Sequence, residues 1–352
     1  MLKSIEIKNY RGIKNLKIDN FKKYNFFVGD NGSCKTTILE SLFSAFPNSP
    51  EGIITAANSR GLQVNLDNKY NFFFNADEEN KIEFILNDEI VTKINTKNFI
   101  EKNSLDLTNT SVSIEAKLSS LMSPKFLYNS LKSHGEKVFL DVDIMIDNIF
   151  NITTNIKNIN NNLLNKYSKI YGSSYFISPS IKYKGNASLV IKELIKNKKK
   201  NELIDILNLF EKDIDDINLD GSQVLLSKKG VKKLLPISSF GGGLSSILDI
   251  VTYLFDDEIK TLFIDEIETG IHYLNYPKFC KSLIKVSKEK DIQLFITTHS
   301  KEILEEFYKI LENTNKDDTC LYRFQKNNDT IKSVHYTKER ALSAIQNNWD
   351  VR

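Results

Sequence analysis

Cysteine is scarce in this sequence, and long apolar runs are missing from it. The three cysteines, Cys34, Cys280 and Cys320, lie far apart with no paired spacing. This pattern is typical of a reducing compartment and provides no paired thiolates for a structural zinc site. No stretch approaches the roughly 18 apolar residues of a transmembrane helix, and the N-terminal segment has no signal-peptide core. We therefore expect a cytoplasmic protein with no membrane partner.

Arginine is also rare, and the excess of charge is small. The basic residues are nearly all lysine, and the arginines are Arg11, Arg60, Arg323, Arg340 and Arg352. A net charge of +3 is too small to indicate a nucleic-acid partner by itself. Few arginines also argue against extensive bidentate phosphate recognition. We expect nucleic-acid binding, where it occurs, to be weak and sensitive to salt.

The second half of the chain shows a regular alternation of apolar patterns. With 352 residues and 41% hydrophobic content, the chain can bury a large core in one or two domains. The predicted helices cover residues 244–255, 275–289, 300–312 and 337–346, and the predicted strands cover 261–264, 293–297, 319–325 and 331–336. Alternation at these lengths predicts an α/β fold with a mostly parallel sheet, flanking helices and a ligand site at the carboxyl ends of the strands.

The first half is less regular. Partial period-two alternation over residues 81–86, 89–94 and 111–116 predicts an antiparallel β meander. Residues 128–170 are rich in Asn and Lys, and we expect helices and loops there. Residues 189–209 have helical spacing, interrupted at the lysines of 198–200. That stretch is far too short for a long antiparallel coiled coil, which needs many heptads.

Residues 29–37, Gly-Asp-Asn-Gly-Ser-Cys-Lys-Thr-Thr, form a phosphate-binding loop motif with one letter changed. An apolar run that predicts a strand precedes the motif, and a helical pattern follows it, which is the context the motif requires. Backbone amides and the helix N-terminus would cradle phosphate, Lys35 would reach the β- and γ-phosphates, and the Thr36 hydroxyl would bind Mg²⁺. Cys34 stands where the motif has its second glycine, so it must bear backbone strain or the loop must relax. The candidate phosphate contacts are Gly29, Asn31, Gly32, Ser33, Cys34, Lys35, Thr36 and Thr37.

Polar residues follow two buried-looking strands downstream. Asp265 and Glu266 end the strand over 261–264, and His299 follows the strand over 293–297. Two adjacent carboxylates cannot both face a core cheaply. One can hold a metal while the next polarises an attacking water, and His299 is a candidate γ-phosphate sensor.

A glycine triplet, Gly241, Gly242 and Gly243, opens an apolar helix within residues 238–246, which we call the signature segment. It predicts a second anion-binding helix start that has no local anion to bind.

Together these motifs resemble the heads of ABC-type ATPases. Lys35, the glycine triplet, Asp265 with Glu266, and His299 occur in the same order as in those heads. The long gap between the phosphate loop and the signature segment resembles the SMC, RecF and OLD branch. Residues 5–13, 265–272 and 297–304 resemble the same branch, and residues 176–180 resemble the OLD-like ATPases of phage defence. The resemblance covers both ends of the chain well and residues 75–170 poorly.

The resemblance implies ATP and Mg²⁺ as cofactors, with Thr36 and Asp265 as metal ligands and Glu266 and His299 as catalytic residues. It also implies an ATP-sandwiched homodimer, in which Ser239, Gly241, Gly242 and Gly243 face the γ-phosphate held by a second subunit. Arg11 would contact the nucleotide phosphates. A glutamine is expected to contact the metal between residues 60 and 80, where Gln63 is the only one, but its context does not fit the family pattern.

We expect one discontinuous ATPase domain. Residues 1–130 would form its N-terminal lobe with an antiparallel β lobe, residues 131–235 a mainly helical insert, and residues 236–352 the C-terminal lobe. The chain has no evident second catalytic cluster, so we expect it to act as an ATP-driven switch for a separate nuclease or toxin, in phage defence. Its turnover would be slow because of Cys34.

Other functions remain open at this stage. A DNA repair or recombination ATPase of the RecF or SMC type carries the same motifs, and a clamp that binds nucleotide without hydrolysis would carry most of them. A self-sufficient nuclease would need an acidic cluster that the residues after His299 do not provide in a strand context. A transporter ATPase is disfavoured by the long gap before the signature segment.

Overall fold

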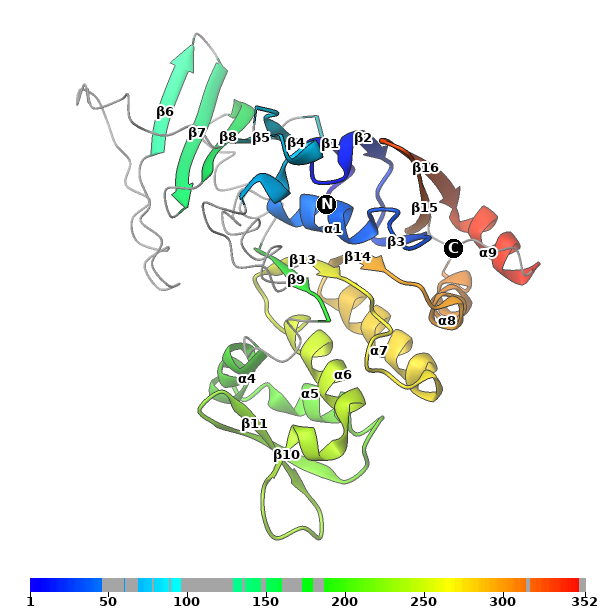
Figure 1. Ribbon diagram of the computed structural model, residues 1–352. Helices are drawn as coiled ribbons and strands as arrows, with labels where there is room; N and C mark the ends of the chain where they lie inside the picture. Colours follow the sequence, from blue (N-terminus) through cyan, green and yellow to red (C-terminus); the bar gives the residue numbers. More distant parts are fainter. Residues whose placement is uncertain are drawn as a thin grey trace.

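The computed structural model describes residues 1–45, 60, 69–77, 79–88, 90–95, 129–134, 137–146, 150–159, 173–179, 187–314 and 317–347. Its described strands form three sheets, and Figure 1 shows how the helices flank them. The strands are β1 (Ser4–Tyr10), β2 (Ile13–Asp19), β3 (Tyr24–Gly29), β4 (Ile82–Leu86), β5 (Ile90–Asn95), β6 (Asn129–His134), β7 (Lys137–Ile146), β8 (Phe150–Ile159), β9 (Ser173–Ile177), β10 (Ile214–Asp220), β11 (Gln223–Lys228), β12 (Leu235–Pro236), β13 (Ile259–Ile264), β14 (Gln293–Thr297), β15 (Thr319–Asn327) and β16 (Thr330–Thr337). The helices are α1 (Lys35–Ser44), α4 (Ala187–Lys196), α5 (Lys200–Leu207), α6 (Gly242–Tyr253), α7 (Tyr276–Glu289), α8 (Lys301–Glu312) and α9 (Lys338–Gln346), with 3₁₀ turns η1 (Lys69–Phe72), η2 (Phe74–Ala76), η3 (Ile237–Phe240) and η4 (Tyr273–Asn275).

A six-stranded sheet forms the centre of the fold, in the order β16-β15-β3-β14-β13-β9. Every neighbouring pair is parallel except β15 with β16. Every residue of β3 and β14 is buried, as expected for central strands of a parallel sheet that is covered on both faces. The sheet and the helices from α6 onward confirm the α/β fold predicted from the alternating pattern.

Alternate residues of these strands face two separate cores. Phe27, Phe263 and Phe295 pack on one face with α1 and the strands β1, β2 and β4. Phe26 and Ile264 pack on the other face with the apolar sides of α6, α7, α8 and α9. The helices α1 and α6 therefore lie on opposite faces of the central sheet, as Figure 1 also shows.

A second sheet of seven strands, in the order β2-β1-β4-β5-β8-β7-β6, has antiparallel pairing throughout. The strands β4 and β5 confirm the meander predicted over residues 81–94, and the stretch 111–116 lies outside the described residues. The strands β7 and β8 show that the expectation of helices and loops over 128–170 is wrong for its described part. Apolar residues alternate from Val138 to Ile146, a period-two signal that the Asn- and Lys-rich composition of the region obscured.

A smaller lobe combines α4 and α5 with the three-stranded sheet β10-β11-β12. The two helices confirm the helical spacing predicted over 189–209, with the break at the predicted lysines, where Lys198 has a positive φ of 56°. The described part of residues 131–235 contains both strands and helices, so it is mixed rather than mainly helical. Within the part of the chain that the structure describes, no helix is both long and apolar enough to cross a membrane.

Candidate functional site

The loop over residues 29–37 joins the carboxyl end of β3 to the start of α1. Gly29 and Gly32 adopt positive φ angles of 141° and 81°. A Cβ at Gly29 would overlap the carbonyl oxygen of Phe324, so glycine is required there. Cys34 also lies in the left-handed region, with φ 68° and ψ 20°. Cysteine thus adopts a conformation that glycine would adopt at lower cost, which confirms the strain inferred from the sequence.

Lys35 is buried beneath this loop, and its ammonium group donates to the loop's own oxygens. Its Nζ lies 2.7 Å from the carbonyl oxygen of Gly29 and 3.0 Å from that of Asp30. Burial lowers the pKa of Lys35, although Asp265 and other carboxylates oppose this effect. Asn31 and Gly32 are exposed at the mouth of the loop, whereas Ser33 and Thr37 are buried.

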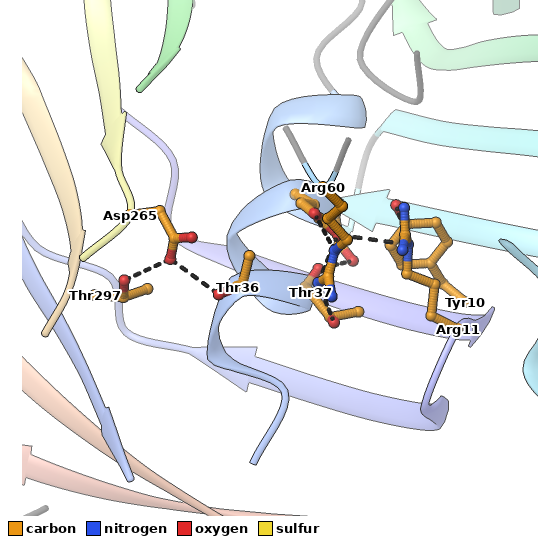
Figure 2. Close-up of polar contacts among 9 residues, drawn as sticks. Tyr10, Arg11, Thr36, Thr37, Arg60, Asp265 and Thr297 are labelled. Atoms are coloured by element: carbon orange, nitrogen blue, oxygen red, sulfur yellow. Dashed lines mark hydrogen bonds and ion pairs between the residues drawn. The ribbon is translucent and has the colours of Figure 1, made fainter. Parts of the chain in front are cut away.

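Asp265 connects the loop to the carboxyl ends of two neighbouring strands. Its Oδ1 accepts hydrogen bonds from Thr36 Oγ1 at 3.0 Å and from Thr297 Oγ1 at 2.6 Å, as Figure 2 shows. Asp265 is only 5% exposed, and this burial raises the pKa of its carboxyl to about 6, against the two hydroxyl bonds that lower it. The structure thus brings together Thr36 and Asp265, the two residues predicted as metal ligands.

Glu266 sits in a strained turn directly after Asp265. Its φ is 46°, and its backbone N–H donates to Thr297 Oγ1 at 2.8 Å. Its Oε2 accepts a hydrogen bond from Thr269 Oγ1 at 3.3 Å. A non-glycine residue with positive φ persists only where neighbouring contacts hold it, and such strain is frequent at functional sites.

His299 follows β14 on the same edge of the sheet, next to a carboxylate that our sequence reasoning assigned to no role. The His299 backbone N–H donates to Glu268 Oε1 at 2.7 Å, and Thr298 Oγ1 donates to Glu268 Oε2 at 2.8 Å. The sequence signal for Glu268 was present as a third acid shortly after Asp265 and Glu266.

The signature segment lies elsewhere in the chain's own fold. Ser239 and Gly242 are exposed, and Gly241, with φ 88°, is the residue that precedes α6. Gly243 packs closely on the backbone of Gly270, because a Cβ at Gly243 would lie 3.2 Å from the Gly270 carbonyl oxygen. The helices that follow the two motifs, α6 after the signature segment and α1 after the phosphate loop, cover opposite faces of the sheet.

Arg11 belongs to a charged cluster around the buried carboxylate of Glu40 on α1. Its Nε lies 3.5 Å from Glu40 Oε2 and donates to the Tyr10 hydroxyl at 3.2 Å. Arg60 forms a two-pronged contact with the same carboxylate, at 2.8 and 3.2 Å, and donates to Thr37 Oγ1 at 3.1 Å. Figure 2 shows both arginines on this side of α1.

Contact between Arg11 and phosphate therefore stays a prediction. The sequence reasoning missed the cluster, although Glu40 was visible as a charge within the apolar run of the helix. The residue Gln63 lies outside the described residues.

A phosphate loop, a metal-type hydroxyl–carboxylate pair and a polar strand end on one edge of a parallel sheet define an ABC-type ATPase head of the SMC, RecF and OLD branch. The sequence pattern of the AAA ATPase domain family matches residues 1–304, and the chain belongs to this family. It is therefore a nucleoside triphosphatase of the AAA and SMC type.

Two proteins show sequence similarity to the chain. An ATP/GTP phosphatase of Helicobacter pylori is 28% identical over 325 residues, which cover 87% of each protein. An uncharacterized protein of Methanocaldococcus jannaschii, MJECL10, is 42% identical over 52 residues, which are 15% of this chain and 23% of that protein.

Solved structures of SMC heads share the fold. An SMC head bound to the C-terminal winged-helix domain of ScpA aligns with a TM-score of 0.56 and 12% identity, over 97% of this chain and 99% of that one. An SMC head with an extended coiled coil, bound to the C-terminal domain of ScpA derived from Pyrococcus furiosus, aligns with a TM-score of 0.51 and 11% identity, over 99% of each chain. At these identities the likeness concerns the fold alone.

Proposed function

We propose that this protein binds ATP with Mg²⁺ and hydrolyses it at the carboxyl edge of the central sheet. The observation that carries the proposal is the hydrogen-bonded series Thr36–Asp265–Thr297, which links the phosphate loop to β13 and β14. Amides of residues 29–37 and the Lys35 ammonium group would bind the phosphates. The two hydrogen bonds that Lys35 now makes to loop carbonyls are the contacts that it would exchange for phosphate oxygens.

The residues at this edge also fit Mg²⁺. A hydroxyl and a carboxylate oxygen 3.0 Å apart are the hard oxygen donors that Mg²⁺ prefers, and Asp265 is deeply buried. Thr36 and Asp265 would hold the ion, which would neutralise phosphate charge when bound. Thr297 would orient the carboxylate through its 2.6 Å hydrogen bond.

Glu266 would orient and deprotonate the attacking water, and His299 would contact the γ-phosphate. Glu266 has one carboxylate oxygen bonded to Thr269 and a backbone held by Thr297, so its position is set by its neighbours. General-base assistance typically contributes about 10²–10⁴-fold to the rate. We propose that Cys34 makes turnover slower than a glycine would, because its Cβ crowds the point where the backbone approaches phosphate.

A mutation of Lys35 tests nucleotide binding. Lys35→Ala removes a charged donor whose hydrogen bonds contribute about 1.5–3 kcal/mol, so ATP affinity should fall roughly ten- to hundredfold. Titration with a fluorescent ATP analogue measures it, with far-UV circular dichroism to verify folding. The control is Lys14→Ala, which removes an exposed lysine of β2 and should leave the affinity unchanged. Wild-type affinity in folded Lys35→Ala protein would contradict the site, and binding without turnover in the wild type would favour a non-hydrolysing clamp.

We further propose that ATP controls a separate effector, a nuclease or toxin in phage defence. The motifs assigned above account for nucleotide chemistry, and the resemblance to OLD-like defence ATPases supports the setting. The two similar SMC heads were solved with a bound domain of ScpA, which supports a head of this fold as a docking platform for another protein.

The effector proposal predicts that the purified chain hydrolyses ATP but leaves plasmid DNA and RNA intact. Gel assays with Mg²⁺ or Mn²⁺, in low and physiological salt, measure this. The opposite result would be metal-dependent cleavage that persists in Asp265→Asn protein and disappears when an acid elsewhere in the chain is changed. That result would assign a nuclease activity to this chain itself.

A further inference from the structure

The turn after β13 carries a third carboxylate, Glu268, that the proposed chemistry does not use. Its two oxygens have separate partners on the segment after β14: Oε1 accepts from the His299 backbone N–H at 2.7 Å, and Oε2 accepts from Thr298 Oγ1 at 2.8 Å. The N–H bond is at the short end of the range for its donor, the hydroxyl bond has an ordinary length, and hydrogen bonds to a charged acceptor are the stronger kind. Glu268 therefore bridges the turn that holds Glu266 to the segment that holds His299.

Two more hydrogen bonds join the same pair of segments. The Glu266 N–H donates to Thr297 Oγ1 at 2.8 Å, and the Ile267 N–H donates to the Thr297 carbonyl oxygen at 3.2 Å. Residues 266–268 are thus fastened to residues 297–299 at successive positions. Among these contacts, only those of Glu268 use a flexible side chain with both of its acceptor atoms engaged.

These hydrogen bonds hold the backbone of Glu266 in a strained conformation. A positive φ at a non-glycine residue costs on the order of 1–3 kcal/mol and persists only when surrounding contacts over-determine it. Glu266 has such a φ, at 46°. Glu268 lies two residues further along the same turn and anchors it from the far side, so loss of its bonds would let the turn relax towards an unstrained conformation and move Glu266 away from His299.

We infer that Glu268 is a positioning residue of the hydrolytic site, which sets Glu266 and His299 in register through two hydrogen bonds and does not itself touch the reacting atoms. This inference rests on the proposed roles of Glu266 and His299. It assigns a function to a carboxylate that an acid count alone would assign to metal binding or to solvent.

The inference predicts a split between binding and turnover. Glu268→Ala should lower kcat for ATP about ten- to hundredfold, as expected for the loss of hydrogen bonds to a charged group, while KM changes by less than about threefold. Glu268→Gln should recover most of the rate, because its carbonyl oxygen can accept from His299 N–H and its amide can donate to the Thr298 hydroxyl. Glu289→Ala, which removes an exposed glutamate at the end of α7, is the matched control and should behave as wild type.

A double mutant tests whether Glu268 acts through Glu266. If it does, Glu268→Ala should lower single-turnover hydrolysis much less in a Glu266→Gln background than in the wild type, because one of the two groups that it positions is already lost. Three results would overturn the positioning role, provided that Glu266→Gln still abolishes turnover. They are a wild-type kcat in Glu268→Ala protein, equal impairment in Glu268→Gln and Glu268→Ala, and fully additive losses in the double mutant. Unchanged turnover in Glu266→Gln would overturn the proposed function and this inference together.

Discussion

At the scale of single residues, two residues of the site have left-handed backbone conformations, which residues other than glycine rarely adopt. They are Cys34, with φ 68°, and Glu266, with φ 46°. Cys34 lies in the turn between strand and helix, and at Glu266 the compensation is the bond that its N–H donates to Thr297, together with the bond that Glu268 accepts from the His299 N–H. Strain of this kind is expected where geometry is held for chemistry.

Cys34 gives a residue-scale prediction. Cys34→Gly removes a left-handed strain of about 1–2 kcal/mol and the Cβ that crowds the loop. We expect ATP turnover to rise up to about tenfold and the midpoint of thermal unfolding to stay the same or rise, since glycine's entropic cost of roughly 0.5–1 kcal/mol offsets part of the gain. Steady-state ATPase assays and differential scanning fluorimetry measure both quantities.

The control for this prediction is Cys34→Ala, which removes the sulfur but keeps the Cβ and the strain. Its turnover should stay near that of the wild type. A slower Cys34→Gly variant would show that the loop is adapted to cysteine and that strain does not limit the rate.

At the scale of elements, the turn after β13 contacts both the end of β14 and the helix α6, which follows the signature segment. Its first residues bond to the end of β14, and Gly270 lies against the start of α6. Gly270 has φ 80°, and a Cβ there would lie 2.5 Å from Ser246 Oγ. Because this glycine has no side chain, α6 can pack directly on the turn that carries Glu266.

Gly270→Ala should therefore destabilise the protein through two effects, an unfavourable φ and a steric overlap with Ser246. Gly221→Ala in the β10–β11 hairpin is the matched control, because its φ of 58° brings the first effect while no atom lies within 4 Å of the added Cβ. Overpacking typically costs about 1–3 kcal/mol, so Gly270→Ala should lose that much more than the control. Urea unfolding curves measure the difference, and equal losses would show that the packing at Gly270 is loose.

The helices and strands also show which sequence patterns were sufficient to predict secondary structure. The helices and strands after residue 241 were predicted within a few residues of their bounds because their periodicity is strong and local. The strands β7 and β8 were missed because the Asn- and Lys-rich composition of the region obscured their alternation, and because β8 also pairs with β5, which is distant in sequence. Sheet propensity depends on such pairing more than on the residues themselves.

At the scale of the whole molecule, α1 and α6 place the phosphate loop and the signature segment, the two expected parts of a composite nucleotide site, on opposite sides of the central sheet. The two helices cover opposite faces of the central sheet, and the signature segment is exposed at Ser239 and Gly242. A second copy related by a two-fold axis would present its signature segment to this phosphate loop and complete both sites at once. This arrangement supports the proposed ATP-sandwiched dimer.

The dimer gives a prediction for the whole molecule. Glu266→Gln should bind ATP without rapid hydrolysis and accumulate as a dimer in multi-angle light scattering, whereas the nucleotide-free protein stays monomeric. Adding Ser239→Arg should abolish that dimer, because an arginine would occupy the space facing the second subunit's phosphate. Adding Ser343→Arg, on an exposed position of α9, is the control and should not affect it. A dimer that forms without ATP and survives Ser239→Arg would place the subunit contact elsewhere.

The sequence by itself determined the phosphate loop, the acids after β13, the polar end of β14 and the alternation that makes a parallel sheet. Each of these depends on residues within one or two turns of the chain, so local propensity and spacing suffice to predict them. It also indicated strain at Cys34, because a missing glycine is visible in a motif.

Only the tertiary structure decided which of these groups meet. Thr36 and Asp265 are 229 positions apart, and their 3.0 Å contact exists because β3, β14 and β13 lie side by side with their carboxyl ends at one edge. The same holds for the bridge from Glu268 to residues 298 and 299, the two arginines at the buried carboxylate of Glu40, and the placement of α6 across the sheet from α1. Contacts between distant segments follow from the order of the strands and the packing of the two cores. No local sequence pattern encodes that order or that packing.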